Sequence, residues 1–335
     1  MPNANRSPLS LPVLRADVLR ADSGANQGDT LSFADELMLD DTYVLTRAPD
    51  PQPLVLRPDP LGSFTIARTS KVGAAGATVH LDSGLTWMSP DGQTHEMLVL
   101  VELDAESMIA ELYVLPLSPL GPKTEYRLVG IDKDGARSRL AQVACVSFTA
   151  GTHITLSTGE QRKVQDLCAG DKILTRDDGP QELRWIGHST QRAMGAFAPI
   201  KIAAGTLHNS ADLVVSPDHR LFIYQRSDEL GLGRSEVMVR ARHMVNGHSI
   251  TWMDGGFVDY YQLLFDTHQI IYAEGIAAET LLLDERTEPA LPADMAATLM
   301  AQTLHHSSDH DDLELADPGH SGAELADLLR RASTG

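Results

Sequence analysis

Short strand-like runs separated by turn residues fill most of this chain, and they constrain its fold more than any other feature. Runs rich in branched and apolar residues follow one another from about residue 61 to the 270s, with turns such as Pro90–Gly92 and Lys133–Gly135 between them. Helical periodicity is nearly absent until 292–304 and 323–331. The sequence therefore predicts a mainly β protein.

Changes in composition divide the chain into four parts. Residues 1–60 are mildly acidic, are weakly periodic and end in a proline-rich run, so we expect a linker-like segment there. Residues 61–146 predict a small antiparallel β domain. Strand signals continue through a second all-β domain at 147–284. Residues 285–335 are rich in Ala, His, Asp and Ser, and they predict a flexible, partly helical tail.

The charge balance and the cysteines exclude several classes of function. The chain has 27 Lys and Arg against 46 Asp and Glu, a net charge of −19, which argues against nucleic acid or an anionic membrane surface as a partner. Its two cysteines, Cys145 and Cys168, have no metal-ligand spacing. Two free thiols are favoured over a single bridge between them. We expect no cofactor and no bound metal.

No targeting or membrane-spanning segment is evident. The apolar run Leu9–Leu14 is short, is broken by Pro12 and has no small-residue cleavage site behind it. No window reaches the roughly 18 consecutive apolar residues that a spanning helix needs. We therefore expect a soluble protein, either cytoplasmic or secreted by a route that uses no N-terminal signal.

A weak internal repeat lies between residues 160 and 275. Each copy has a glycine-turn element first and a histidine-bearing strand second, with a longer insertion in the first copy. Chance similarity between β-rich segments is one explanation. The other is a duplicated half-domain with pseudo-two-fold symmetry, which would place His219 and His268 at equivalent positions facing a shared centre. The paired segments are 166–173 with 243–250, and 214–222 with 263–271.

Several short motifs in a fixed order carry a family resemblance. They are Ser147–Ile154, Val164–Ile173, Leu183–Gly187, Pro199–Gly205, Leu213–Arg220, Leu263–Gly275 and Ala278–Thr280. Together they resemble the Hint family, the self-processing module shared by hedgehog proteins and inteins, and the middle motifs resemble its bacterial branch. The resemblance implies an all-β horseshoe with internal two-fold symmetry.

The resemblance also implies a self-cleaving site. Ser147 stands at the nucleophile position, from which it would attack the carbonyl of Val146 and convert an amide into an ester. His219 matches the family histidine that protonates the departing nitrogen, which is a poor leaving group otherwise. Ser216 stands where the family usually has threonine, and its hydroxyl would stabilise the scissile amide or its oxyanion.

Two later residues complete the set that the resemblance implies. Asp266 and His268 match the late acidic and histidine positions, which would polarise the nucleophile or activate an attacking group. Cys145 is out of register for this chemistry, so we interpret it as a structural residue. A serine hydrolase acting on other substrates lacks support because no Gly-x-Ser-x-Gly elbow is present.

This sequence departs from the family pattern at two points. Serine replaces the usual cysteine, and a serine hydroxyl is a weak nucleophile that depends on an adjacent base. The segment after residue 275 also lacks the His-Asn ending with which inteins cyclise. We therefore expect single-turnover autoproteolysis at Val146–Ser147 without splicing, with the N-terminal β domain as the substrate. The alternative is a catalytically degenerate Hint domain that acts as a binding or scaffold module.

Overall fold

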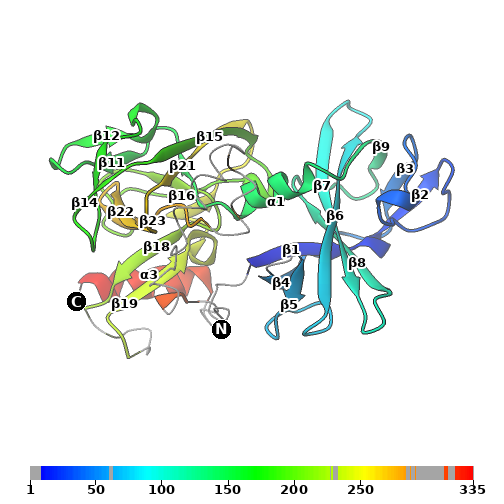
Figure 1. The fold of residues 1–335 in the computed structure, drawn as a ribbon, viewed down its shortest axis with the longest axis horizontal. Helices are drawn as coiled ribbons and strands as arrows, with labels where there is room; N and C mark the ends of the chain where they lie inside the picture. The colour runs from blue at the N-terminus through cyan, green and yellow to red at the C-terminus, as the bar shows by residue number, and fades with distance from the viewer. Residues whose placement is uncertain are drawn as a thin grey trace. The chain divides into compact units, whose positions relative to one another are not determined.

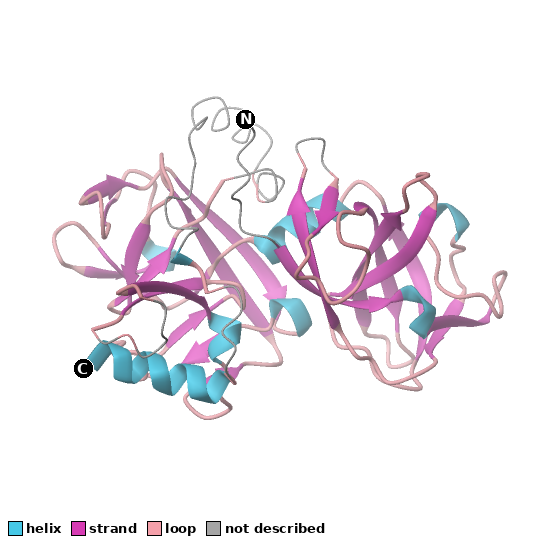
Figure 2. Ribbon diagram, turned by 90° about the horizontal axis from the view of Figure 1, so that it is seen from below, coloured by secondary structure: helices cyan, strands magenta, loops and turns pink. Residues whose placement is uncertain are grey.

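The computed structural model divides the chain into two compact units, unit 1 (residues 1–143) and unit 2 (residues 144–335). Strands make up most of the regular structure in each unit (Figure 1; Figure 2). The prediction of a mainly β protein is thus confirmed. The residues that the structure describes are 9–59, 63–226, 228, 233–283, 287, 291, 313–315 and 321–334.

Unit 1 is built on one nine-stranded antiparallel sheet. Its order is β2-β3-β9-β6-β5-β4-β1-β8-β7, and β7 also pairs with β6, so six of the strands close into a barrel. Closure removes exposed sheet edges from those six strands. The strands are β1 (Leu9–Arg15), β2 (Leu19–Ser23), β3 (Thr42–Leu45), β4 (Gln52–Pro58), β5 (Phe64–Ile66), β6 (Thr78–Met88), β7 (Thr94–Leu103), β8 (Ile109–Pro116) and β9 (Glu125–Asp132).

The core of unit 1 is formed around large aromatic side chains. Trp87 and Tyr43 are almost fully buried and meet edge to face, with ring centroids 4.9 Å apart. Such edge-to-face pairs add specific geometry to the stabilisation that comes from apolar burial. Tyr126 and the aliphatic side chains of β6, β7 and β9 surround them.

The segment over residues 1–60, expected to be linker-like, is instead folded as part of this unit over its described residues, 9–59. Strands β1 to β4 all lie within it, and Leu54 and Leu56 are fully buried. The proline-rich composition was misleading because Pro12 and Pro53 face each other across the β1–β4 pair. Neither proline has a backbone N–H, so both missing hydrogen-bond donors lie at the same position of the β1–β4 pair.

Unit 2 consists of two six-stranded antiparallel sheets and a hairpin. The first sheet has the order β15-β21-β10-β17-β16-β20, the second β12-β11-β22-β23-β18-β19, and β13 pairs with β14. Asp178 and Gly179 lie in the turn of that hairpin, and Gly179 has the positive φ that such a tight turn favours. The strands are β10 (Phe148–Thr149), β11 (His153–Thr155), β12 (Gln161–Lys163), β13 (Lys172–Leu174), β14 (Pro180–Glu182), β15 (Trp185–Arg192), β16 (Ile200–Ile202), β17 (Leu213–Val215), β18 (Arg220–Tyr224), β19 (Glu236–Arg240), β20 (Ile250–Trp252), β21 (Phe257–Leu264), β22 (Ile270–Ala273) and β23 (Ile276–Glu279).

The two predicted repeat histidines occupy matching places between these sheets. His219 lies in the connection from β17 in the first sheet to β18 in the second. His268 lies in the connection from β21 in the first sheet to β22 in the second. Both side chains are buried. The chain therefore crosses between the same two sheets at each histidine, as the repeat in the sequence suggests.

Helices are short in the part of the chain that the structure describes. The helix predicted at 323–331 is present as α3, whereas the one predicted at 292–304 lies outside the described residues. No described helix has the length and hydropathy needed to cross a membrane. The helical segments are α1 (Ala136–Ala144), α3 (Gly322–Thr334), η1 (Ala16–Val18), η2 (Ala34–Glu36), η3 (Val164–Asp166), η4 (Gly195–Phe197) and η5 (Ala241–Met244).

The described part of the C-terminal segment is not a flexible tail. Leu325 and Leu329 of α3 are fully buried, and they belong to the same apolar core as the side chains of β18 and β19. Leu315 joins that core as well. The alanine and leucine spacing of α3 places one apolar face on unit 2, so these residues are part of its fold.

Candidate active site

Ser147 occupies a buried position at the start of unit 2. It follows α1 by three residues and directly precedes β10, and it is only 2% exposed. Phe148, the first residue of β10, pairs with β17 on one side and β21 on the other. The peptide bond before Ser147 is therefore held against the interior of the first sheet.

Ser216 and Ser147 form a reciprocal pair of hydrogen bonds. The Ser147 N–H donates to Ser216 Oγ at 3.0 Å, and the Ser216 N–H donates to the Ser147 carbonyl oxygen at 3.0 Å. The Ser147 nitrogen belongs to the Val146–Ser147 peptide bond. The hydroxyl of Ser216 thus contacts the nitrogen that would leave if this bond were cut.

The ring of His219 lies between two backbone carbonyls. Its Nδ1 is 3.1 Å from the Ser147 carbonyl oxygen, and its Nε2 is 3.1 Å from the Glu279 carbonyl oxygen. The ring also packs on Phe148, with centroids 4.5 Å apart. His219 is fully buried, so its orientation is fixed by these contacts.

These contacts make protonation of His219 a balance of opposing effects. A neutral imidazole has a single N–H, whereas both ring nitrogens here face carbonyl acceptors, so a second proton would complete both hydrogen bonds. Burial lowers the pKa of His219, while the Glu279 carboxylate and the two carbonyls act in the opposite direction. The effect of burial is the largest, so the pKa of His219 is lowered overall, and a proton placed on this ring is readily given up.

Glu279 connects His219 with His268. Its carboxylate binds the Arg220 guanidinium at 2.6 Å and lies 3.5 Å from His268 Nε2. Burial alone would raise the pKa of Glu279, but Arg220 and His268 lower it well below its usual range. Both repeat histidines therefore meet at one ionised glutamate, His219 at its backbone and His268 at its side chain.

Gln262 is a site residue that sequence reasoning missed. Its Nε2 donates a hydrogen bond to Ser147 Oγ at 3.0 Å, and its side chain is buried. Gly187 faces Gln262 across the β15–β21 pair, and a Cβ at that position would lie 2.3 Å from Gln262 Oε1. The missing side chain at Gly187 makes room for this amide. An amide in the otherwise apolar run after Tyr261 was the available signal.

The family match agrees with this geometry. Residues 146–285 match the model of the Hint domain. These residues form a Hint domain. The match covers about two fifths of the chain, and it begins one residue before the buried serine.

Two solved structures are each similar to this chain over about two fifths of its length. The crystal structure of the gp41-1 intein is 12% identical with a TM-score of 0.25, and it is aligned over 40% of this chain and 97% of its own. The crystal structure of the Ssp DnaB mini-intein variant M86 is 14% identical with a TM-score of 0.27, over 42% and 97%. No curated protein matches the sequence.

Asp266 is the one predicted residue that the structure places away from the others. It follows the end of β21, its side chain is 61% exposed, and it forms an ion pair with Arg184 at 2.8 Å. Ser147, Ser216 and His219 are not among its hydrogen-bond partners in the described residues. The strand ends before Asp266, so its carboxylate turns outward.

The two cysteines of the chain are placed differently and form no disulfide. Cys145 is buried in a small apolar cluster with Leu264 and Leu281, and Cys168 is exposed. The position of Cys145 inside that cluster fits the structural role expected for it.

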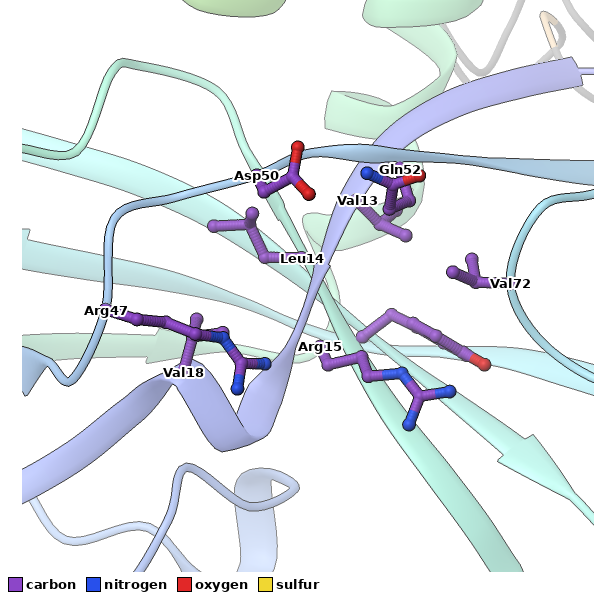
Figure 3. Close-up of a pocket in the computed structure, with 9 residues that line it drawn as sticks. Val13, Leu14, Arg15, Val18, Arg47, Asp50, Gln52 and Val72 are labelled. Carbon is purple, nitrogen blue, oxygen red and sulfur yellow. The ribbon is translucent and has the colours of Figure 1, made fainter.

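A separate cavity lies wholly within unit 1, and no residue of the Hint domain lines it. It encloses about 240 Å³. Figure 3 shows Arg15 and Arg47 on one side of it and Val72 on another. Arg15 pairs with Glu111 at 2.8 Å and Arg47 with Asp17 at 2.9 Å, so both cationic groups are already compensated.

Proposed function

We propose that the Hint domain cuts its own chain at the Val146–Ser147 bond by an N-to-O acyl shift, without splicing. The observation that carries this proposal is the set of contacts around Ser147. Its amide nitrogen contacts the hydroxyl of Ser216, and its carbonyl contacts the imidazole of His219. The nucleophile, the departing nitrogen and a proton donor are thus held on adjacent groups inside one buried site.

The first step is an isomerisation. Ser147 Oγ attacks the carbonyl carbon of Val146, its hydroxyl proton is released, the C–N bond breaks, and the departing nitrogen gains a proton. His219 would supply that proton as general acid, since burial makes its ring a weak holder of protons. As the nitrogen becomes pyramidal, the hydroxyl of Ser216 can donate to it instead of accepting from it.

The second step releases the N-terminal part. Water or another nucleophile attacks the ester between Val146 and Ser147 Oγ, which leaves a carboxylate on Val146 when water is the attacker. The acyl donor is then the chain's own N-terminal part, unit 1 included. The event occurs once per chain, so the protein would be a single-turnover autoprotease and not a turnover enzyme.

One observation favours the alternative of a binding or scaffold module that no longer cuts. The hydrogen bond that reaches Ser147 Oγ comes from the amide of Gln262, which is a donor and not a base. A serine hydroxyl needs a base to become a good nucleophile. Among the described residues, no carboxylate or imidazole is hydrogen-bonded to this oxygen.

Intact mass measured over time separates the two functions. Cleavage gives products of 146 and 189 residues, roughly 16 and 20 kDa of the 36.3 kDa chain. Ser147→Ala must abolish both products, and Ser147→Cys must accelerate their appearance, because a thiol with a pKa of about 8.5 supplies thiolate near neutral pH. Ser157→Ala, in a turn of the same domain, is the matched control and should cut like the wild type.

If the wild type and the Ser147→Cys variant both stay whole with hydroxylamine present, cleavage is excluded and the binding role is favoured.

A further inference from the structure

A segment beyond the matched Hint domain contributes to the surroundings of the proposed site. We call the described residues 313–315 and 321–334 the C-terminal clasp. Its helix α3 packs on η5 and on β18. Figure 1 shows α3 beside β18. The Arg226 N–H after β18 donates to the Ala332 carbonyl of α3 at 2.7 Å. The clasp is therefore attached to the strand that begins directly after His219.

Glu314 brings a buried charge into this region. It forms a bridge with Met238 of β19, and the next residue, Leu315, donates its N–H to the Met238 carbonyl at 2.9 Å. The Glu314 carboxylate lies 3.1 Å from the Arg220 guanidinium and 2.7 Å from the Arg240 guanidinium. The side chains of the three charged residues are only 6% to 10% exposed, so solvent screens these pairs little.

The two arginines share a small set of carboxylates that are buried or largely buried. Arg220 also binds Glu279, and Arg240 also binds Asp218 at 2.9 Å. Burial lowers the pKa of Arg240, but Asp218 and Glu314 more than compensate and raise it. Taking away one partner of a buried ion pair leaves an uncompensated charge, which is strongly destabilising. Without Glu314 the remaining charges must rearrange.

The rearrangement reaches His219 through Glu279. The Glu279 carboxylate accepts from the Arg220 backbone N–H at 2.9 Å and from the Arg220 Nε at 2.7 Å. The backbone carbonyl of Glu279 contacts His219 Nε2. Arg220 therefore fixes the position of Glu279, whose carbonyl contacts His219. Glu314 in turn fixes the position of Arg220 through their ion pair.

We propose that the C-terminal clasp completes the active site, with Glu314 as a positioning residue for His219, so that self-cleavage waits until the clasp has been synthesised and docked. This inference rests on the proposed function and adds a regulation to it. The nucleophile is at residue 147 and the clasp lies more than one hundred and fifty residues later. During synthesis, a chain that has been extended only to residue 285 would contain the whole matched domain and still lack the ion pair between Glu314 and Arg220.

Gly322 shows how closely the clasp fits. A Cβ at this position would lie 2.0 Å from the Val245 carbonyl oxygen, which follows η5. Backbone cannot yield as the end of a side chain can, so Gly322→Ala must shift α3. The substitution perturbs docking without removing any charge.

The test compares Glu314→Gln with Asp327→Asn, which removes a 70% exposed carboxylate from the same segment. In a Ser147→Cys background, Glu314→Gln should slow cleavage about tenfold or more, whereas Asp327→Asn should stay within about twofold. In an uncleavable Ser147→Ala background, the ring nitrogen signals of His219, assigned with His219→Asn, should move in Glu314→Gln and stay in place in Asp327→Asn. Gly322→Ala should give the Glu314→Gln pattern.

The two readouts keep this proposal apart from the proposed function. If no variant cleaves, the ring signals of His219 still test whether Glu314 positions it. A Glu314→Gln protein that melts about 6–20 °C lower but keeps the cleavage rate and the His219 signals would overturn the proposal, because Glu314 would then be purely structural. Glu314→Asp keeps the charge, so it supplies a folded variant if Glu314→Gln does not fold, and it should retain part of the rate and smaller signal shifts.

Discussion

The environment of His243 leads us to expect that unit 2 loses stability when the pH falls below neutrality. It lies in η5, and its Nδ1 is buried with no hydrogen-bond partner among the described residues. Burial is the largest effect that lowers its pKa, and the positive charges of Arg242 and Arg240 act in the same direction, so that the pKa falls from 6.5 to about 4. Between pH 6.5 and about pH 4, His243 therefore binds a proton in the unfolded chain but not in the folded chain.

The sign and size of the effect follow from this difference. The contribution of His243 is complete above pH 6.5 and is lost as the pH falls toward 4, because the unfolded state takes up the proton first. Moving from pH 7 to pH 5 should cost about 2 kcal/mol of unfolding free energy. His219 contributes in the same direction, since its pKa is also lowered.

The assay is urea unfolding of the Ser147→Ala chain at pH 7 and pH 5, followed by the methyl signals of Met238 and Met244. Both methionines are fully buried in unit 2, so they report on this unit by itself. In His243→Phe the difference between the two pH values should shrink by about 2 kcal/mol. His248→Gln, at an exposed histidine, should leave it unchanged. An equal loss in His243→Phe and the parent would refute the reasoning.

Three further outcomes are expected. Gly187→Ala should displace the Gln262 amide from the nucleophile and change the cleavage rate of the Ser147→Cys chain by about tenfold, as measured by intact mass. The control Gly84→Ala should leave the rate unchanged, because its added Cβ would meet only ordinary contacts at 3.6 Å and beyond. Asp266→Asn should leave that rate within about twofold, since its carboxylate is exposed and bound to an arginine. A thiol reagent should label Cys168 quickly in the native chain and the second, buried thiol only after unfolding, as counted by mass.

The sequence carried the arrangement of the crossing histidines because a repeat preserves order and spacing. The segments around His219 and His268 were aligned by their apolar pattern and by the histidine itself, and both histidines lie in a connection between the same two sheets. Their meeting at Glu279 could not be foreseen, since it depends on how β18, β22 and β23 pair. Local pattern predicts which strands exist better than it predicts which side chains meet.

The same limit explains the residues that were missed or misplaced. Gln262 reaches Ser147 because β21 lies beside β10, a pairing between segments more than one hundred residues apart. Asp266 has the same strand parity as Gln262 but lies beyond the end of β21, where the chain turns outward. Glu314 sits in a segment whose polar composition predicted a flexible tail, and only tertiary contacts reveal its role.

The burial of Ser147 bears on whether the proposed reaction can run backward. Cleavage would turn its peptide nitrogen into a new chain terminus, an α-amine with a pKa of about 8 that is cationic at neutral pH. At a residue that is 2% exposed, this charge would be expensive to keep in place. The two-residue strand β10 would then tend to detach and carry the amine into water. Each cut would dismantle the geometry that made it, which makes the event a one-way step.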